Sequence, residues 1–267
     1  MSITAIIGAG VMGETLLSGL VRAGRPPAEL LVGEKRPERA RELEEKYAVA
    51  VVSNLDATKR ADTVALVVKP QDMAGLLDEI GPAVRPGQLV VSLAAGITTR
   101  FLESRLPDGV PVVRVMPNTP ALVAEGMAAI APGLHCDAEH LSVAEDLLGS
   151  TGRVLRVPEA QMDAVTAISG TGPAYVFFVV ESMIEAGVHL GLPRATATEL
   201  VVQTLVGSAK MLRETGTHPT VLREQVTSPG GTTAAALREL EVHRVRAAFL
   251  AAMEAARNRS AQLAEGS

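Results

Sequence analysis

Two glycine-rich stretches, at opposite ends of the chain, have the residue types needed to hold negatively charged groups. The first is GAGVMG at residues 8–13, a G-x-G-x-x-G string. The second is SPGGTT at residues 228–233, which combines two glycines with three hydroxyl side chains. Each comes directly before a stretch with a helical pattern. Because backbone N–H groups at such turns attract anions, we predict an anion-binding site at each end of the chain.

The first stretch has the context of a dinucleotide fingerprint, since it follows a predicted strand at 3–7 and opens a predicted helix at 12–23. In that context Gly8 allows the tight turn, Gly10 lets the backbone approach a pyrophosphate, and Gly13 lets the helix pack closely on the strand. The alternative is a flavodoxin-like domain in which the same turn binds no dinucleotide. We predict dinucleotide binding.

The residues after the predicted second strand bear on which dinucleotide is bound. Glu34 could accept hydrogen bonds from the free 2′-hydroxyl of NAD, whereas Lys35 and Arg36 could neutralise the 2′-phosphate of NADP. Alternatively, Lys35, Arg36 and Arg39 are only the solvated start of a helix. We favour NADP, with NADPH as the preferred reductant and NAD as a possible substitute.

Three further polar residues follow predicted strands. Lys69 ends the strand predicted at 63–68 and could contact the cofactor ribose or a substrate carboxylate, or could simply leave the sheet. Asn54 is expected in a loop after the strand at 50–52, as an adenosine contact or as a turn residue. Asn118, in MPNTP at 116–120, offers a polar group at the nicotinamide end, unless the segment is only a rigid turn.

The second stretch suits a small carboxylate better than a diphosphate, because it has neither a preceding strand nor a basic residue within it. Thr232 or Thr233 could instead only cap the helix, with Gly230 and Gly231 serving the turn. If the stretch does bind a ligand, one loop holds the cofactor phosphates and the other holds the substrate acid, and hydride crosses between the two domains.

The elements that must position these residues follow from the hydrophobic pattern. Strand-like segments lie at 3–7, 30–32, 50–52, 63–68, 89–93, 112–116, 127–131 and 154–157, and helical patterns at 12–23, 37–47, 71–80, 100–106 and 138–148. This alternation predicts an α/β fold with a parallel, doubly wound Rossmann-type sheet. After residue 157 only helices are predicted, at 158–168, 172–187, 194–214 and 232–265. We therefore predict a dinucleotide-binding domain at 1–157 and a helical substrate-binding and dimerisation domain at 158–267.

The helix predicted within PAYVFFVVESMIEAGVHL is apolar on more than one face, which favours burial in a partner chain and hence an intertwined homodimer. Composition disfavours other partners. Aromatic residues are 2% of the chain and the net charge is −5, which argues against nucleic acid. No run of about 18 uninterrupted apolar residues indicates a membrane span, and no basic leader is present, so we expect a cytoplasmic protein.

Cysteine and histidine provide no metal or disulfide pattern. Cys136 is the only cysteine. With His135, Asp137 and His140 it is better interpreted as a loop before a helix than as a metal site, and we predict no metal.

The motifs GAGVMG, VVKPQ, RVMPNTPA, SGTGPAY and VTSPGGTTAAALRELE together resemble the pyrroline-5-carboxylate reductase family over nearly the whole chain. The resemblance implies a Rossmann domain, a helical dimerisation domain, and NAD(P)H-dependent reduction of Δ1-pyrroline-5-carboxylate to L-proline, the last step of proline biosynthesis. It also implies active sites completed by the C-terminal loop of a partner subunit, and dimers that often assemble into rings.

The resemblance and the motifs together define the predicted site. The predicted substrate-binding residues are Asn118, Val226, Ser228, Gly230, Gly231, Thr232 and Thr233, with Thr233 positioning the ring nitrogen or the carboxylate. The predicted cofactor-binding residues are Gly8, Gly10, Val11, Met12, Gly13, Lys35, Arg36, Asn54, Val68, Lys69, Pro70, Ala94 and Met116. The motifs contain no histidine to act as a general acid, which fits reduction of a cyclic imine that enters already protonated.

Three other functions compete with this interpretation. A β-hydroxyacid dehydrogenase-like reductase would need a lysine after the interdomain glycine turn, but residues 169–187 contain none. A deazaflavin-dependent reductase would share the first half of the chain and leave the second loop unexplained. A non-catalytic NADP-binding redox sensor would show no reductase activity.

Overall fold

The computed structural model describes residues 2–265 and divides into two compact units. The first comprises Met1–Thr171 with Ala256–Ser267, and the second comprises Gly172–Ala255. The predicted division at residue 157 therefore differs from the division between the compact units. Met162 explains the difference, because its side chain is fully buried against Ala129 and Ala131 of the sheet and ties the segment after residue 157 to the first unit.

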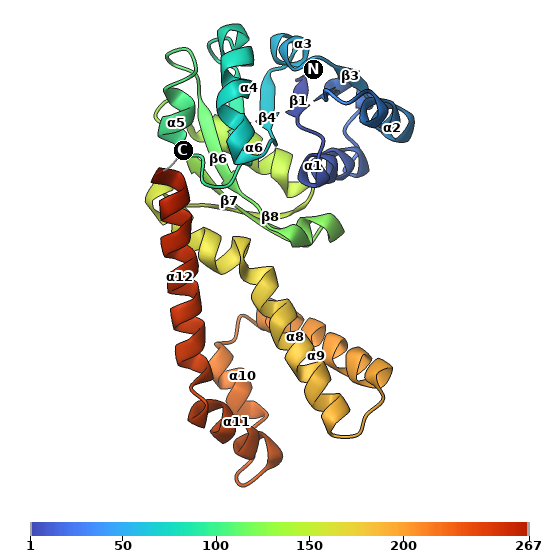
Figure 1. Ribbon diagram of the computed structural model, residues 1–267, viewed down its shortest axis with the longest axis vertical. Coiled ribbons are helices and arrows are strands. Elements are labelled where there is room, and N and C mark those ends of the chain that lie inside the picture. The colour runs from blue at the N-terminus through green and yellow to red at the C-terminus, as the bar shows by residue number, and fades with distance from the viewer. Residues whose placement is uncertain (1, 266–267) are drawn as a thin grey trace. The chain divides into compact units, whose positions relative to one another are not determined.

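The first unit is built on an eight-stranded sheet with the order β3-β2-β1-β4-β5-β6-β7-β8 (Figure 1). The strands are β1 (Thr4–Ile7), β2 (Leu30–Gly33), β3 (Ala50–Val52), β4 (Thr63–Leu66), β5 (Leu89–Ser92), β6 (Val112–Met116), β7 (Gly126–Pro132) and β8 (Gly152–Arg156). All eight predicted strands are present, with ends shifted by up to two residues. The order reverses between β1 and β4, which is the switch point where open α/β sheets bind ligands.

One strand pair departs from the predicted parallel sheet. β6 and β7 pair antiparallel, with Val115 opposite Ile130, whereas every other pair in the sheet is parallel. The reason is the short connection, which consists of a single 3-10 turn at Thr119–Val123. A parallel return needs a crossover of a dozen or more residues.

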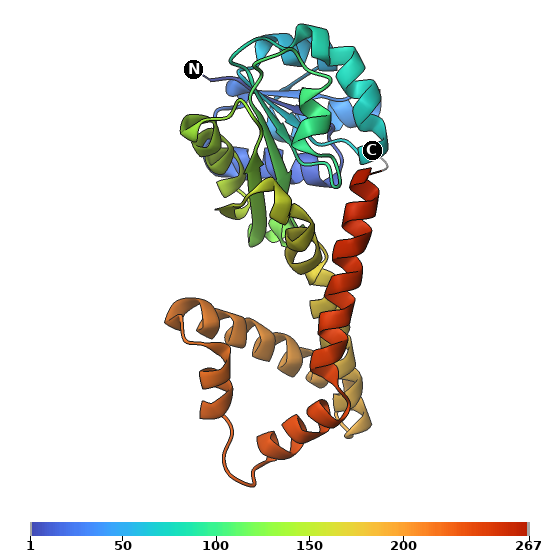
Figure 2. The ribbon, with the colours of Figure 1, turned by 90° about the vertical axis from the view of Figure 1, so that its left-hand side faces the viewer.

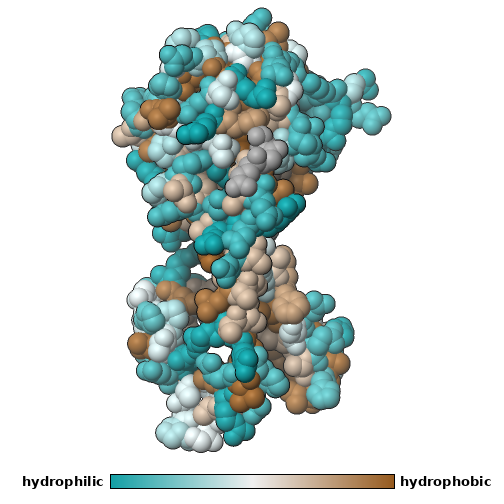
Figure 3. Space-filling model, turned by 60° about the vertical axis from the view of Figure 1, so that its left-hand side comes forward, coloured by the Kyte–Doolittle hydropathy of each residue, from teal (hydrophilic) through white to brown (hydrophobic). Residues whose placement is uncertain are grey.

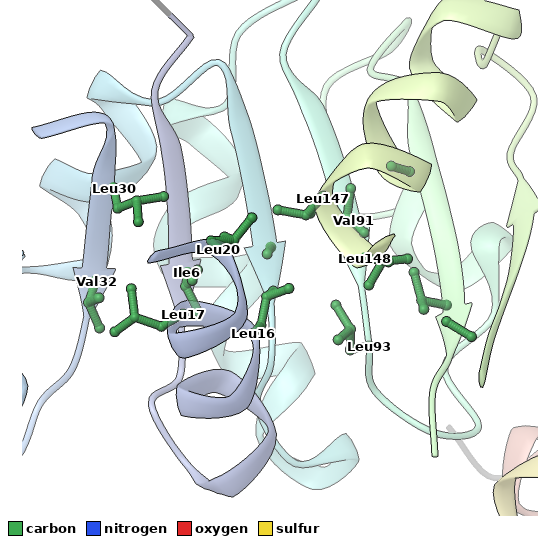
Figure 4. Packing of buried hydrophobic residues seen from close by; sticks show 14 of the residues in the cluster. Ile6, Leu16, Leu17, Leu20, Leu30, Val32, Val91, Leu93, Leu147 and Leu148 are labelled. Atoms are coloured by element: carbon green, nitrogen blue, oxygen red, sulfur yellow. The ribbon is translucent and has the colours of Figure 1, made fainter. Parts of the chain in front are cut away.

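Helices cover both faces of the sheet, as a doubly wound fold requires. One face carries α1 (Val11–Arg22), α2 (Pro37–Tyr47) and α6 (Ala138–Gly149), and the other carries α3 (Asn54–Arg60), α4 (Met73–Ile80) and α5 (Thr99–Glu103). Figure 4 shows Leu16 and Leu20 of α1, and Leu147 and Leu148 of α6, against the strands on one face. Because alternate residues of a strand point to opposite faces, Ile6 lies in this cluster and Ile7 in the other.

The remaining elements of the first unit include a short 3-10 turn before α4 (Pro70–Asp72) and a segment after β8. That segment contains a 3-10 turn (Glu159–Gln161), α7 (Met162–Val165) and a π-helical stretch (Thr166–Gly170) where a regular helix was predicted. Asn54 was predicted in a loop, but it is the buried first residue of α3. The prediction missed α3 because NLDATKR is short and mostly polar.

The second unit contains α8 (Gly172–His189), α9 (Arg194–Thr215), α10 (Pro219–Gln225), α11 (Thr232–Val242) and the first part of α12 (Val245–Glu265). The single helix predicted at 232–265 is interrupted at Arg244, whose backbone has a left-handed φ of 56°. The helix α10 was not predicted. Helices α8 and α9 pack side by side (Figures 1 and 2).

The helices of the second unit bury almost nothing within the described chain. Ala197 is the one buried apolar residue within 172–255, and α8 has no buried residue at all. Phe177 and Phe178 are 65% and 70% exposed. Figure 3 shows apolar residues at the surface. Exposure of such a large apolar surface to water is energetically unfavourable, so these surfaces indicate contact with another protein chain.

Within the described residues, one helical stretch, Glu159–His189, is long and apolar enough by length and composition to cross a membrane, with a hydropathy of 1.3. It contains polar and charged residues, so it is not an uninterrupted apolar run. Its first residues belong to the first unit, where Met162 is buried against the sheet. This packing, and the exposed apolar faces of neighbouring helices, favour protein contacts for the stretch.

Candidate nucleotide and substrate sites

A pocket of about 540 Å³ lies where β1, β2 and β4 end at their carboxyl edges. It brings together four residues that were predicted to contact a cofactor, namely Gly8, Lys35, Asn54 and Val68. Its other lining residues are Ile7, Gly33, Glu34, Gln71, Asp72, Gly75 and Leu76. The pocket is therefore at the switch point of the sheet, where the fold places a ligand.

The glycines of the 8–13 loop differ in what surrounds them. Gly8 has a φ of +97°, and an added Cβ would lie 2.5 Å from the Val67 carbonyl oxygen. A Cβ on Gly13 would collide with the Gly8 carbonyl oxygen. Gly10, in contrast, is exposed and a Cβ there would meet nothing within 4 Å. Gly8 and Gly13 are thus required by the fold itself, while Gly10 leaves open space beside the N-terminus of α1.

The helix that follows the loop presents its N-terminus without a side-chain cap. Gly10 is the N-cap of α1 and offers no side-chain acceptor, so the first backbone N–H groups lack an intrahelical partner. Val11, which is 70% exposed, and Met12 begin this turn. An open glycine, free N–H groups and the positive end of a helix dipole fit a pyrophosphate.

The two cations predicted to read the 2′-position are each held by a carboxylate. Arg36 donates from Nε and Nη2 to the two Glu34 carboxylate oxygens, at 3.0 Å each. The Lys35 ammonium lies 2.8 Å from Glu79 Oε2. Arg36 holds the pKa of the Glu34 carboxyl below its ordinary value. The Glu34 carboxyl is therefore ionised near neutral pH and already paired with Arg36.

A second ionic network connects the glycine loop and α1 to α2. Glu14 of α1 accepts hydrogen bonds from Lys46 (2.8 Å), from the Tyr47 hydroxyl (2.9 Å) and from Arg39, all on α2. Arg39 also donates from Nε to the Ala9 carbonyl oxygen at 3.3 Å. Chiefly because of Lys46 and Arg39, the Glu14 pKa falls to about 2. The network ties α2 to both α1 and the loop.

Three other residues that were predicted to contact the cofactor come at or just after the ends of strands, but they do not line the pocket. Lys69 is exposed and caps the 3-10 turn that Pro70 begins, three residues past the end of β4. Ala94 is buried after β5, and Met116 is half-buried at the end of β6. Their contact with a cofactor stays a prediction.

The side-chain amide of Asn118 forms hydrogen bonds with other residues of the first unit. Its Oδ1 accepts from the Met127 backbone N–H at 2.8 Å, and its Nδ2 lies 3.3 Å from Ser169 Oγ. These bonds join the turn after β6 to β7 and to the π-helical stretch. They support the rigid-turn interpretation, while the contact with substrate stays a prediction.

The 228–233 loop has its own local geometry in the second unit. The Gly231 N–H donates to the Ser228 carbonyl oxygen at 3.1 Å, and Gly230 has a φ of +68°, so the turn needs glycine there. The N-cap of α11 is Gly231, and no side chain caps the helix. Thr232 and Thr233 therefore do not act as the N-cap, contrary to the alternative considered from sequence.

What remains is a helix N-terminus with unpartnered N–H groups, next to exposed hydroxyl side chains. Ser228 and Thr232 are exposed, Thr233 is half-buried, and Val226 is 65% exposed just before the turn. This arrangement suits a small anion such as a carboxylate.

The stretch from His135 to His140 forms a loop and helix start, as predicted. The Asp137 side chain caps α6, and the His140 Nδ1 accepts from the Asp137 N–H at 3.2 Å. Across residues 2–265, no group of three or more potential ligand side chains is arranged to hold a metal ion.

Sequence reasoning missed several pocket residues. Gln71, Asp72 and Gly75 come from the 3-10 turn and α4, which looked like an ordinary amphipathic helix. The signal available was their position just after VVKP, since residues beyond a strand at the switch point face the ligand site.

Sheet order, glycine turn and pocket together define the class of Rossmann-type dinucleotide-binding proteins. Residues 3–96 match the family described as "NADP oxidoreductase coenzyme F420-dependent", and residues 159–263 match "Pyrroline-5-carboxylate reductase dimerisation". The chain is 46% identical to a pyrroline-5-carboxylate reductase of Corynebacterium melassecola, covering 98% of this chain and 99% of that one. It is 46% identical to the enzyme of the same name from Mycobacterium tuberculosis, covering 98% and 97%.

Solved structures agree with the sequence relatives. A pyrroline-5-carboxylate reductase from Coxiella burnetii has a TM-score of 0.94 and 35% identity, with 98% of each chain covered. A pyrroline carboxylate reductase from Plasmodium falciparum, solved with NADP bound, has a TM-score of 0.88 and 30% identity over 98% of each chain. The chain belongs to the pyrroline-5-carboxylate reductase family, and it is an oxidoreductase of proline biosynthesis.

Proposed function

We propose that this chain reduces Δ1-pyrroline-5-carboxylate to L-proline with NAD(P)H, preferring NADPH. The observation that carries the proposal is the pairing of a nucleotide pocket at the sheet's switch point with a second, separate anion-binding turn, in a chain of this family. A reductase that joins a dinucleotide to a small amino-acid-like substrate needs both features.

Different residues of the first unit would bind the pyrophosphate, the adenosine and the 2′-phosphate of the cofactor. The open space at Gly10 and the uncapped start of α1 would hold the pyrophosphate. The pocket lined by Gly33, Asn54 and Leu76 would receive the adenosine, and Lys35 and Arg36 would neutralise a 2′-phosphate. When bound, the reduced nicotinamide supplies a hydride.

The residues of the 228–233 loop would bind and orient the substrate. The N–H groups at the start of α11 and the Ser228 hydroxyl would hold the carboxylate, and Thr233 would position the ring nitrogen or the carboxylate. The imine can enter protonated, so hydride addition to the C=N carbon turns the C=N electron pair into a nitrogen lone pair without forming an anion. The chain then needs only to orient the reactants and exclude water, and no acidic side chain has to donate a proton.

We propose a homodimer through the second unit, with the 228–233 loop completing an active site of the partner subunit. The exposed apolar faces of α8 and α9 and the match to a dimerisation family support this arrangement. Assembly of dimers into a ring, and a cytoplasmic location, are part of the same proposal.

The competing functions have less support. The match to the F420-dependent family ends at residue 96 and leaves the second unit unexplained. The β-hydroxyacid dehydrogenase alternative lacks its lysine, because α8 contains none. A redox sensor remains a distinct outcome of the assay below.

The test is oxidation of NADPH, followed by its absorbance, in the presence of Δ1-pyrroline-5-carboxylate, with proline as the product identified by chromatography. The same preparation assayed with NADH measures the cofactor preference. NADPH binding without turnover would favour the sensor, and faster turnover with NADH would contradict the NADPH preference.

A further inference from the structure

The charges around the nucleotide pocket do not form a simple phosphate site. Glu34 and Asp72 line the pocket with Lys35, and Glu79 and Arg36 are bonded to its lining residues. Three carboxylates thus accompany two cations, and each cation already has a carboxylate partner. A 2′-phosphate, which carries nearly two negative charges, must therefore compete with a carboxylate for either cation.

Glu79 stands out among these carboxylates because it engages two pocket residues at once. Its Oε2 accepts from Lys35 Nζ at 2.8 Å and lies 3.5 Å from Asn54 Nδ2. Lys35 comes from the segment after β2, Asn54 from the start of α3, and Glu79 from the last turn of α4. The carboxylate therefore restrains the ammonium group on the α4 side of the pocket.

The restraint is weak enough to be exchanged. The side chains of Lys35 and Glu79 keep 72% and 33% of their surfaces exposed. Ion pairs of this exposure contribute little to stability, so a dianionic phosphate can compete for the lysine. A 2′-hydroxyl, which carries no charge, gains nothing from freeing it.

We infer that Glu79 limits the discrimination between 2′-phosphorylated and 2′-hydroxyl dinucleotides, because it holds Lys35 in an ion pair with which a 2′-phosphate must compete. Glu79 is a positioning residue that acts through Lys35. The inference rests on the proposed function only in taking this pocket as the site of the adenosine end.

Two fragments that differ at the 2′-position test the inference without any turnover. The affinities of adenosine 2′,5′-bisphosphate and adenosine 5′-monophosphate are measured by calorimetry on the full-length protein at low salt. For Glu79→Gln we expect 2′,5′-bisphosphate affinity to rise about three- to fivefold, the amount that an exposed ion pair contributes. The monophosphate affinity should change by less than about twofold, because it makes no use of Lys35.

Asp78→Asn is the matched control, since Asp78 lies one residue earlier on α4 and pairs with Arg105 outside the pocket. It should leave both affinities unchanged. Glu79→Asp, which keeps the charge, should resemble the wild type. In a Lys35→Ala background, Glu79→Gln should no longer raise the bisphosphate affinity, because the lysine that it frees is absent.

The inference is overturned if Glu79→Gln changes both fragments equally, weakens the bisphosphate, or keeps its full effect without Lys35. In each of those cases the wild type still binds both fragments and the proposed nucleotide site stands. If the wild type binds neither fragment, the nucleotide site and the inference fail together.

Discussion

The three glycines of the 8–13 loop serve different physical purposes although they belong to one motif. Gly8 takes a left-handed conformation against the Val67 carbonyl, and Gly13 faces the Gly8 carbonyl. Both positions exclude a side chain whether or not a ligand is present. Gly10 has no such constraint within the chain, so only a bound group can explain a need for glycine there.

Gly10→Ala and Gly13→Ala therefore form a matched pair. We expect Gly13→Ala to destabilise the fold by about 1–3 kcal/mol, the usual cost of overpacking. Gly10→Ala should leave the free energy of unfolding, measured in urea, within about 0.5 kcal/mol of the wild type. It should nevertheless weaken NADPH binding, measured by fluorescence titration. Unchanged NADPH affinity in Gly10→Ala would contradict the proposed pyrophosphate position.

Thr233 is the hydroxyl residue of the second loop that is partly shielded from solvent. Thr233→Ala should raise the KM for Δ1-pyrroline-5-carboxylate about three- to tenfold, as expected for the loss of one hydrogen bond. The KM for NADPH should not change. Thr198→Ala, in which an exposed hydroxyl bonded to the Arg194 carbonyl is removed from α9, is the control. Equal kinetics of the two variants would show that Thr233 does not contact the substrate.

At the scale of elements, the position of the glycine loop depends on how α1 and α2 are joined. Glu14 on α1 meets Arg39, Lys46 and Tyr47 on α2, and Arg39 reaches the loop at Ala9. Because Arg39 of α2 bonds both Glu14 of α1 and the loop at Ala9, it limits the movement of the two helices and the loop relative to one another. The cofactor loop is therefore held by charge as well as by packing.

This network makes part of the stability depend on pH. Because the Glu14 pKa falls from 4.5 to about 2 on folding, the unfolded chain binds more protons between those values. The Glu14 contribution is complete above pH 4.5 and is lost as the pH falls toward 2. Glu14→Gln should lower the free energy of unfolding by about 1–2 kcal/mol near neutral pH, after allowance for solvent screening.

The measurement is urea unfolding at several pH values. The difference between Glu14→Gln and the wild type should shrink as the pH falls from 4.5 toward 2, because the Glu14 carboxyl of the unfolded wild type then binds a proton that the folded state does not. Glu145→Gln removes a carboxylate whose partner, Arg156, is exposed, and it should have little effect. A constant difference for Glu14→Gln at every pH would contradict the ionic explanation.

The whole molecule cannot be understood from one chain, because the second unit has almost no core of its own. Ala197 is its one buried apolar residue among those described, while Phe177, Phe178 and Leu250 are exposed. Burial of apolar surface is the main favourable term in folding, so helices with this pattern need a partner. In the proposed homodimer, a second copy of the chain would provide the matching apolar faces.

Phe178→Asp should disrupt the proposed dimer, because a charge would enter the apolar interface. We expect sedimentation to shift from dimer to monomer, together with loss of reductase activity and with NADPH binding retained in the first unit. Glu181→Gln, three residues along the same helix, should remain dimeric. A dimeric, fully active Phe178→Asp would place the interface elsewhere.

The sequence by itself determined the strands of the sheet, most of the helices and the family of the chain. All eight strands were predicted, because most of them are buried and appear in the sequence as continuous apolar runs, and the glycine motifs predicted two anion sites. These features are local, because backbone conformation and burial depend mainly on nearby residues. The short polar helix α3 and the antiparallel β6–β7 pair were missed because their local signals are weak.

Only the tertiary structure decided which charges meet. The sequence placed Lys35 and Arg36 beside a phosphate, but folding brings Glu79, 44 residues from Lys35, to within 2.8 Å of its ammonium group. It also assembled the pocket from segments after β1, β2 and β4, which no local pattern relates. Electrostatic interactions act through space between residues distant in the chain, so they are known only once the strands have taken their order.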